Sequence, residues 1–207
     1  MFLSRIAIDL EKRSTMRALE NPEILHGMIE TCFPGERKRT LWRLDELKGN
    51  TYLLILSPDE PDFSSVAEQI GKTDSTPETR NYQPLLDRIQ KGTIWRFRLV
   101  ANPVTSVSEG NGKRGKIKAI TITAQQREWL QRQSEEHGFV LNPNQFDVTR
   151  SEWHVFRKNG KTVSALSATY EGVLTVTDAA LFTESLINGI GRGKAYGMGL
   201  LTVVTYG

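Results

Sequence analysis

The order of strand-like and helix-like segments along the chain restricts its fold more than any other feature. Residues 2–9 alternate between apolar and polar side chains, which is the period of a β-strand. A helix is expected from Asn21-Pro22, because asparagine caps helices and proline suits the first helical position. The other segments expected in this unit are a short helical piece at 14–20, strands at 38–46 and 51–57, a helix at 62–71 and a short strand around 81–89. This order is typical of a ferredoxin-like unit.

A second run of segments with a similar order begins at Ile94. Asn159-Gly160 is the strongest short signal for a tight hairpin, and here it separates strands near 144–158 and 161–176. The other expected segments are a strand from Ile94, strands near 104–107 and 117–122, a helix at 124–135, a helix at 179–188 and a last strand from Leu200 to Thr205. The sequence therefore predicts an α+β protein made of tandem ferredoxin-like (RRM-like) domains. We place these domains at residues 1–89 and 93–207.

Composition narrows the class of protein without identifying it. The 207 residues, 38% of them hydrophobic, are enough for two small packed cores. Lysine and arginine number 27 against 24 acidic residues, which is compatible with a polyanionic partner but does not establish one. Cys32 is the only cysteine, so an internal disulfide is excluded and a reducing compartment fits. The first residues lack a signal-peptide pattern and the apolar runs are too short for a membrane span, so we expect a cytoplasmic protein with no membrane partner.

His26 is the best candidate for acid–base chemistry. It lies on the flank of the apolar stripe of the helix that begins at Asn21-Pro22. Glu23 precedes it by three residues and Glu30 follows by four, so both carboxylates are its neighbours on a helix. Histidine titrates near neutral pH, so it can act as a general acid or base. The alternative is a surface histidine paired with acids.

No metal site is expected. The three histidines of the chain are not spaced as metal ligands, and the single cysteine adds little. His137 and His154 are better explained as structural residues, the first at a helix end and the second within a strand. We therefore expect no metal and no cofactor.

The segment from Gly189 to Gly199 is the densest motif of the chain. Its glycines permit close approach of a ligand, and Arg192 and Lys194 lie among them, which suits a phosphate group. The segment differs from a Walker loop, since neither serine nor threonine follows the lysine and a strand, not a helix, comes next. The alternative is a tight connection that binds nothing.

Basic side chains cluster at several expected turns. Such clusters are often only solvated surface, but several of them in a chain of net charge +3 point to a segregated, phosphate-binding face. The candidate residues for binding are Arg37, Lys38, Arg39, Lys113, Arg114, Lys116, Arg157, Lys158, Lys161, Arg192 and Lys194. The aromatic consensus of an RNA-recognition motif is absent, so base stacking on a sheet face is not supported.

Several stretches occur together in an order that narrows the function. They are Asn21-Pro22-Glu23-Ile24-Leu25-His26, Leu41-Trp42-Arg43-Leu44, Trp95-Arg96-Phe97-Arg98-Leu99-Val100-Ala101-Asn102-Pro103, Trp129-Leu130, Tyr170-Glu171-Gly172-Val173-Leu174 and Gly189 through Leu201. With these stretches the chain resembles, over nearly its whole length, the CasE family of type I-E CRISPR repeat-processing endoribonucleases.

The resemblance implies a function and a set of partners. It implies cleavage of the CRISPR precursor RNA at the 3′ base of each repeat hairpin, by attack of a 2′-hydroxyl and without a metal, leaving a cyclic phosphate. It also implies that the enzyme stays bound to the hairpin as a subunit of Cascade, with other Cascade subunits as partners. His26 matches the catalytic histidine of the family. Where the family often has a tyrosine, this chain has Glu23, which orients His26, favours its protonated form or takes no part.

Two other functions are kept open by the sequence. The first is a non-catalytic RNA-binding subunit that only caps the repeat hairpin, which the replacement of the tyrosine by Glu23 would suit. The second is a nucleotide-binding regulatory domain that uses residues 189–199.

Overall fold

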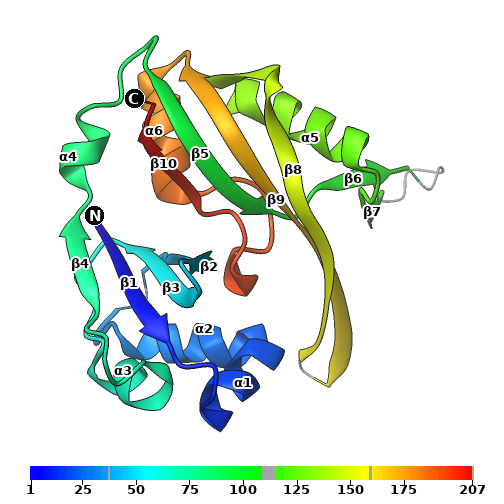
Figure 1. The fold of residues 1–207 in the computed structure, drawn as a ribbon. Coiled ribbons are helices and arrows are strands. Elements are labelled where there is room, and N and C mark those ends of the chain that lie inside the picture. The colour runs from blue at the N-terminus through cyan, green and yellow to red at the C-terminus, as the bar shows by residue number, and fades with distance from the viewer. Residues whose placement is uncertain (37, 109–114, 159, 207) are drawn as a thin grey trace.

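The structure is a computed structural model that describes residues 1–206 apart from 37, 109–114 and 159. This described part contains two four-stranded sheets and a separate two-stranded hairpin, as Figure 1 shows. Helices cover one face of each sheet, which makes an α+β architecture. No helix within the described residues is long and apolar enough to cross a membrane.

The first sheet has the strand order β2-β3-β1-β4, and neighbouring strands are antiparallel. Its elements are β1 (Phe2–Ile8), α1 (Arg13–Glu20), α2 (Pro22–Thr31), β2 (Leu41–Leu47), β3 (Asn50–Ser57), α3 (Ser64–Ile70) and β4 (Glu78–Asn81). The start of α2 is where the sequence predicts it. The side chain of Asn21 accepts a hydrogen bond from the backbone N–H of Glu23 at 3.0 Å, and Pro22 is the first helical residue.

The second sheet has the order β10-β5-β9-β8. In both sheets the strand that comes first in the chain lies between the last and the third, and the second strand lies at the edge beside the third. The elements of the second sheet are β5 (Ile94–Ala101), α5 (Thr123–Glu136), β8 (Phe139–Lys158), β9 (Lys161–Val176), α6 (Ala179–Asn188) and β10 (Leu201–Thr205), with β6 (Val104–Val107) and β7 (Lys116–Ala119) as the inserted hairpin. The prediction of tandem ferredoxin-like domains is therefore confirmed.

The hairpin of β8 and β9 extends well past its own sheet. The pairing runs without interruption from Arg150 with Thr169 to Lys158 with Lys161, and residue 159 lies outside the described residues. Figure 1 shows the far end of this hairpin beside α1 and α2 of the first half. The ring of Phe156 contacts the ring of Tyr196 with centroids 4.7 Å apart, which ties the hairpin to the glycine-rich segment.

The strand expected around residues 81–89 is wrong. Strand β4 already ends at Asn81, and a short helix α4 (Gln83–Leu86) follows it. Pro84 explains this difference, because proline has no N–H for a sheet ladder but fits the first turn of a helix.

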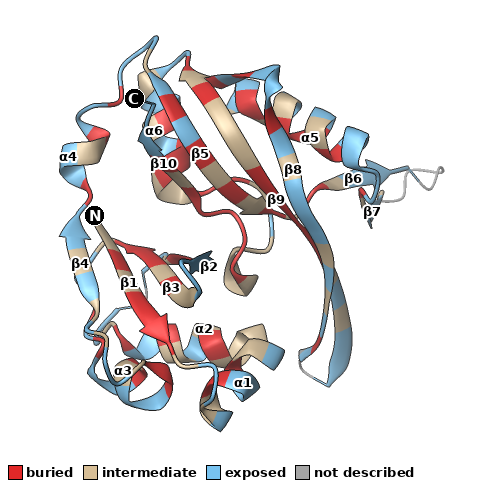
Figure 2. Ribbon diagram, viewed as in Figure 1, coloured by how far each residue is buried: buried red, intermediate tan, exposed pale blue. Residues whose placement is uncertain are grey.

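Two hydrophobic cores support the sheets, and their buried residues are shown in Figure 2. The first includes Ile6, Leu25 and Leu53 and lies between the first sheet and its helices. The second is built around β5, β9, α5 and α6, and it also takes in Leu41 and Leu56 of the first sheet. The two halves therefore share apolar packing. The domain boundary near residues 89–93 stays a prediction.

Candidate functional site

Helix α2 holds His26 at the edge of the first core. Leu25 and Ile29 on the same helix are buried, which fixes the rotation of the helix and leaves the His26 side chain 23% exposed. Its Nε2 atom lies 3.2 Å from Oε1 of Glu30, one helical turn further on. The imidazole is therefore held by a carboxylate and still accessible to a substrate.

A groove of about 450 Å³ opens beside this histidine. Besides His26 and Glu30, its lining includes Lys38, Arg39 and Lys194. These residues come from three separate segments: helix α2, the stretch before β2, and the glycine-rich segment near the end of the chain. The fold thus places a titratable ring next to several cationic side chains.

Lys194 reaches the groove from a short 3₁₀ turn, η1 (Lys194–Tyr196), which two glycines flank. Gly193 and Gly197 have φ angles of 81° and 78°, in the left-handed region that favours glycine. The Nζ atom of Lys194 donates a hydrogen bond to the Gly191 carbonyl oxygen at 2.9 Å. Burial, and then the charge of Arg39, lower the pKa of Lys194 from its ordinary value. This ammonium is partly withdrawn from water, so its charge is less screened than that of an exposed lysine.

The remaining groups of the groove set its charge. Lys38 is already engaged in an ion pair with Asp59, at 2.8 Å on the surface. Arg39 acts on Lys194 through its positive charge. Glu30 is not among the site residues predicted from the sequence. Its position four residues after His26, one helical turn away, was the sequence signal that could have identified it. The backbone N–H of Glu23 donates to the capping side chain of Asn21, and the catalytic role of Glu23 stays a prediction.

The other predicted binding residues lie elsewhere or outside the described part. Arg157 and Lys161 are exposed near the end of the long hairpin, and Lys116 is exposed on β7. Arg192 pairs through its backbone with Asn102 and is exposed. The predictions that lie outside the described residues concern Arg37, Lys113, Arg114 and the side chain of Lys158. Of the predicted cations, the groove thus brings together Lys38, Arg39 and Lys194.

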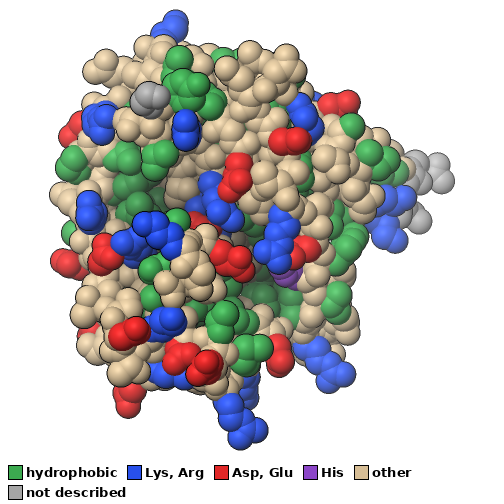
Figure 3. All heavy atoms as spheres, in the orientation of Figure 1, with side chains coloured by type: hydrophobic (Ala, Val, Ile, Leu, Met, Phe, Trp, Pro, Cys, Tyr) green, Lys and Arg blue, Asp and Glu red, His purple; other side chains and the backbone are tan. Residues whose placement is uncertain are grey.

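A second hollow lies between the two sheets. It is lined by residues of β2, β5, β8 and β9, among them Asp45, Arg98, Glu152 and His154. Figure 3 shows basic and acidic side chains side by side on the face where this hollow opens. His154 bonds to Ser167 there through Nε2 at 2.7 Å. Because the charges in this hollow are mixed, we place the candidate anion site at the His26 groove. Within the described residues, no cluster of three or more histidine, cysteine or acidic side chains could hold a metal ion.

Comparisons with known proteins show which family the chain belongs to. A family model described as CRISPR associated protein matches residues 1–204. The chain is 30% identical over 223 residues to the CRISPR-associated endoribonuclease Cse3 of Thermus thermophilus, covering 98% of this chain and 99% of that protein. It is 32% identical over 124 residues to the Cascade subunit CasE of Escherichia coli, covering 56% of this chain and 60% of that protein.

A solved structure supports the same relationship. The CRISPR endoribonuclease Cse3 bound to a 19-nucleotide RNA superposes with a TM-score of 0.84 at 28% identity, covering 99% of this chain and all of the other. The match of the family model, the full-length similarity to Cse3 and the shared two-sheet fold lead to one conclusion: this chain belongs to the CRISPR-associated protein family and is a Cse3/CasE-type member of it.

Proposed function

We propose that this protein is a metal-independent endoribonuclease that cuts CRISPR precursor RNA at the 3′ base of the repeat hairpin. The observation that carries the proposal is the groove in which His26 lies with Lys38, Arg39 and Lys194. Its relatives include an endoribonuclease and a Cascade subunit, and a similar fold has been solved with RNA bound. We further propose that it works in the cytoplasm and stays on the mature RNA as a Cascade subunit.

The proposed reaction is a phosphoryl transfer within the RNA. The 2′-hydroxyl next to the scissile phosphate attacks phosphorus while the bond to the 5′-oxygen of the next nucleotide breaks. The products are a 2′,3′-cyclic phosphate and a 5′-hydroxyl. One proton leaves the 2′-oxygen and one must reach the 5′-oxygen. His26 can carry out one of these transfers, and a positioned acid or base contributes roughly 10²–10⁴-fold to the rate.

Negative charge builds up on the phosphate oxygens in the transition state. Lys194 and Arg39 supply positive charge at the groove, and the partial burial of Lys194 strengthens its attraction for an anion. Glu30, 3.2 Å from Nε2 of His26, holds the ring in orientation. In this arrangement the protein aligns the hydroxyl and the leaving oxygen, which supplies much of the rate enhancement.

Binding of the hairpin requires a wider surface than the groove. We assign this role to the cations at the end of the β8–β9 hairpin, Arg157 and Lys161, and to Lys116 on β7, all of them exposed. The same assignment extends to Arg37, Lys113, Arg114, Lys158 and Arg192 as predictions from the sequence. Phosphate contacts of this kind position a nucleic acid without reading its sequence.

The test is cleavage of a labelled cognate repeat hairpin in the presence of EDTA. We expect a single cut with a cyclic phosphate end, and no cut when the nucleotide before the scissile phosphate is 2′-deoxy. His26→Ala should lower the single-turnover rate about 10²- to 10⁴-fold. His154→Ala, a histidine in the other hollow, is the matched control and should cleave like the wild type. Full activity of His26→Ala, or a requirement for a metal, would refute this mechanism.

A second candidate is a hairpin-binding subunit without catalytic activity. Glu23 favours it, because the family often has a tyrosine at this place. Under this candidate the wild type binds the repeat tightly and leaves it intact in the same assay.

A further inference from the structure

Arg43 of β2 is a fully buried arginine at the junction of the two halves, with 1% of its surface exposed. Its Nε and Nη2 atoms donate to both carboxylate oxygens of Asp45, at 2.8 and 2.7 Å. Its Nη1 donates to the carbonyl oxygens of Arg98 and Leu200 at 3.0 and 2.8 Å, and Nη2 also donates to Oγ1 of Thr202 at 2.9 Å. Among the described residues, every N–H of this guanidinium therefore has an acceptor.

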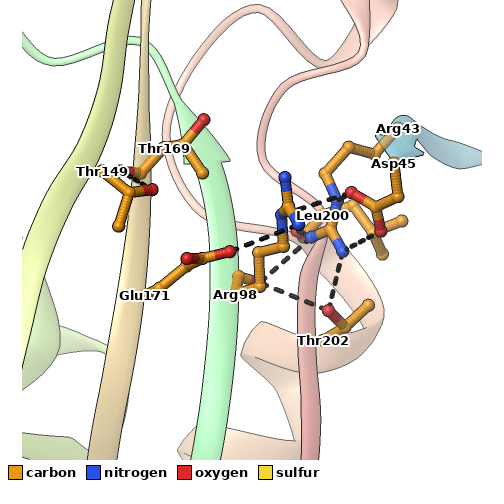
Figure 4. A network of polar contacts seen from close by, with 8 residues as sticks. All are labelled: Arg43, Asp45, Arg98, Thr149, Thr169, Glu171, Leu200 and Thr202. Carbon is orange, nitrogen blue, oxygen red and sulfur yellow. Dashed lines mark hydrogen bonds and ion pairs between the residues drawn. The ribbon is translucent and has the colours of Figure 1, made fainter. Parts of the chain in front are cut away.

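Figure 4 shows that these contacts cross from one half of the protein to the other. Arg43 and Asp45 belong to β2, whereas Leu200 and Thr202 belong to the end of the glycine-rich segment and to β10. A buried charge is costly unless it is fully paired, so this guanidinium holds the Leu200 carbonyl in one position. Lysine, with three donors and no planar fork, could not make the same set of bonds.

The two residues before Arg43 contact the same glycine-rich segment. A Cβ atom at Gly189 would lie 2.9 Å from Cδ1 of Leu41, and one at Gly197 would lie 2.6 Å from the Trp42 ring. Leu41 belongs to the second core and Trp42 to the first, so their side chains lie on opposite faces of β2. Because β2 is the edge strand of its sheet, the glycine-rich segment folds over this edge and touches both faces.

The path of the glycine-rich segment over the edge of β2 determines where Lys194 lies. Both ends of the segment are tied down, since Ile190 N–H donates to Gly199 O at 2.9 Å and Gly199 N–H donates to Val100 O. Between these ties, η1 carries Lys194 to the groove of His26. A change in the position of Leu200 would therefore shift the segment on β2 and move Lys194 relative to His26.

We propose that Arg43 is a positioning residue for RNA cleavage, which acts by fixing the glycine-rich segment on β2 so that Lys194 faces His26. Arg43 lines the hollow between the sheets, not the groove, so it has no contact with the reacting groups. The proposal rests on the proposed function, because it needs the reaction to occur in the His26 groove.

The test is a double-mutant cycle between Arg43→Lys and Lys194→Gln, measured as single-turnover cleavage of the cognate hairpin at saturating protein. Arg43→Lys should lower the rate roughly 10²-fold, the size expected for a small displacement of a catalytic group. Its Kd for the uncleaved hairpin, measured with a 2′-deoxy substrate, should stay within about threefold of the wild type. In the Lys194→Gln background the same change should cost less than about twofold, because the group it positions is gone.

The matched control is Arg98→Gln. It removes the ion pairs of Arg98 with Asp45 and Glu171, at 3.3 and 3.2 Å, but leaves the backbone carbonyl that Arg43 uses. We expect cleavage within about twofold of the wild type. If Arg43→Lys does not fold, Thr202→Val takes its place, since it removes one Arg43 bond and keeps the side-chain size. It should lower the rate about threefold or more, again only when Lys194 is present.

The outcomes separate this proposal from the proposed function. A wild type that leaves the hairpin intact overturns the function itself. Cleavage by the wild type together with unchanged rates in Arg43→Lys and Thr202→Val overturns only the role of Arg43. The role of Arg43 is also overturned if the rate losses of Arg43→Lys and Lys194→Gln multiply in the double mutant, because independent effects would reflect a general destabilisation of the protein. The proposal is supported if Arg43→Lys lowers the cleavage rate when Lys194 is present and barely changes it in the Lys194→Gln variant.

Discussion

At the scale of single residues, the fold removes some charged side chains partly from water. Lys194 illustrates this: its ammonium is held by the Gly191 carbonyl and faces the groove of His26. Burial and the nearby Arg39 both disfavour the charged form, which is why the pKa of Lys194 is lowered. A bound phosphate would relieve this cost, so Lys194 is suited to stabilise an anionic transition state.

Cleavage should therefore depend on the charge of Lys194. As the pH rises through the lowered pKa, the ammonium loses its proton earlier than an ordinary lysine, and the rate should fall in that alkaline range. Lys194→Gln should lower the rate about 10²-fold at neutral pH and abolish this alkaline fall. The measurement is single-turnover cleavage between neutral and alkaline pH. Lys194→Arg is the control, because it keeps the charge and should remove only the fall. An unchanged profile in Lys194→Gln would contradict this role.

At the scale of elements, the β8–β9 hairpin extends past its own sheet as a two-stranded ribbon. A two-stranded hairpin is marginally stable alone, so its packing on other elements matters. Phe156 on one face is buried against Tyr196, whereas Trp153 and Val155 on the other are 52% and 65% exposed. This anchoring holds the cationic end of the hairpin, with Arg157 and Lys161, beside the first half of the protein.

Removing the two described cations at the hairpin end should weaken RNA binding in a salt-dependent way. Each phosphate contact adds roughly 0.7 to 0.9 to the slope of log affinity against log salt concentration. Arg157→Ala combined with Lys161→Ala should therefore lower affinity at low salt and reduce that slope by about one to two. The measurement is hairpin binding over a range of salt concentrations. A variant at Glu46, an exposed residue of β2, is the control. Equal slopes for variant and wild type would refute the assignment.

At the scale of the whole molecule, the two halves are joined by both apolar and polar contacts. Leu41 and Leu56 of the first sheet belong to the core of the second half, together with Tyr82 and Leu86 from the connection between the sheets. The buried guanidinium of Arg43 adds hydrogen bonds across the same junction. If the two halves separated while each stayed folded, the shared apolar surface would be exposed and the Arg43 charge would lose its partners.

The two halves should consequently unfold together. We expect urea unfolding monitored by tryptophan fluorescence and by far-UV circular dichroism to give coincident single transitions. Leu41→Ala should lower the midpoint of the whole transition, because large-to-small changes in a core cost about 2–5 kcal/mol. Exposed Leu47 on the same strand is the control position, where alanine should change stability little. Separate transitions, with only one moved by Leu41→Ala, would show independent halves.

Much of the fold could be predicted because its signals are local. Asn21-Pro22 starts α2 through contacts within a few residues, and Asn159-Gly160 marks the long hairpin. The flank position of His26 also followed from helical periodicity. The misplaced strand around 81–89 shows the limit of such signals, since Pro84 fits the first turn of a helix there and not a sheet ladder.

The sequence by itself determined the order of the elements and the candidate histidine, since both depend on residues a few positions apart. Only the tertiary structure decided that Lys194 shares a groove with His26 and that Arg43 is buried rather than exposed. An arginine is ordinarily a surface residue, and nothing near Arg43 in the chain reveals the carbonyl groups of Arg98 and Leu200 that accept its hydrogen bonds. Such contacts arise when the second sheet packs on the edge of the first, because acceptors far apart in the chain then surround one side chain.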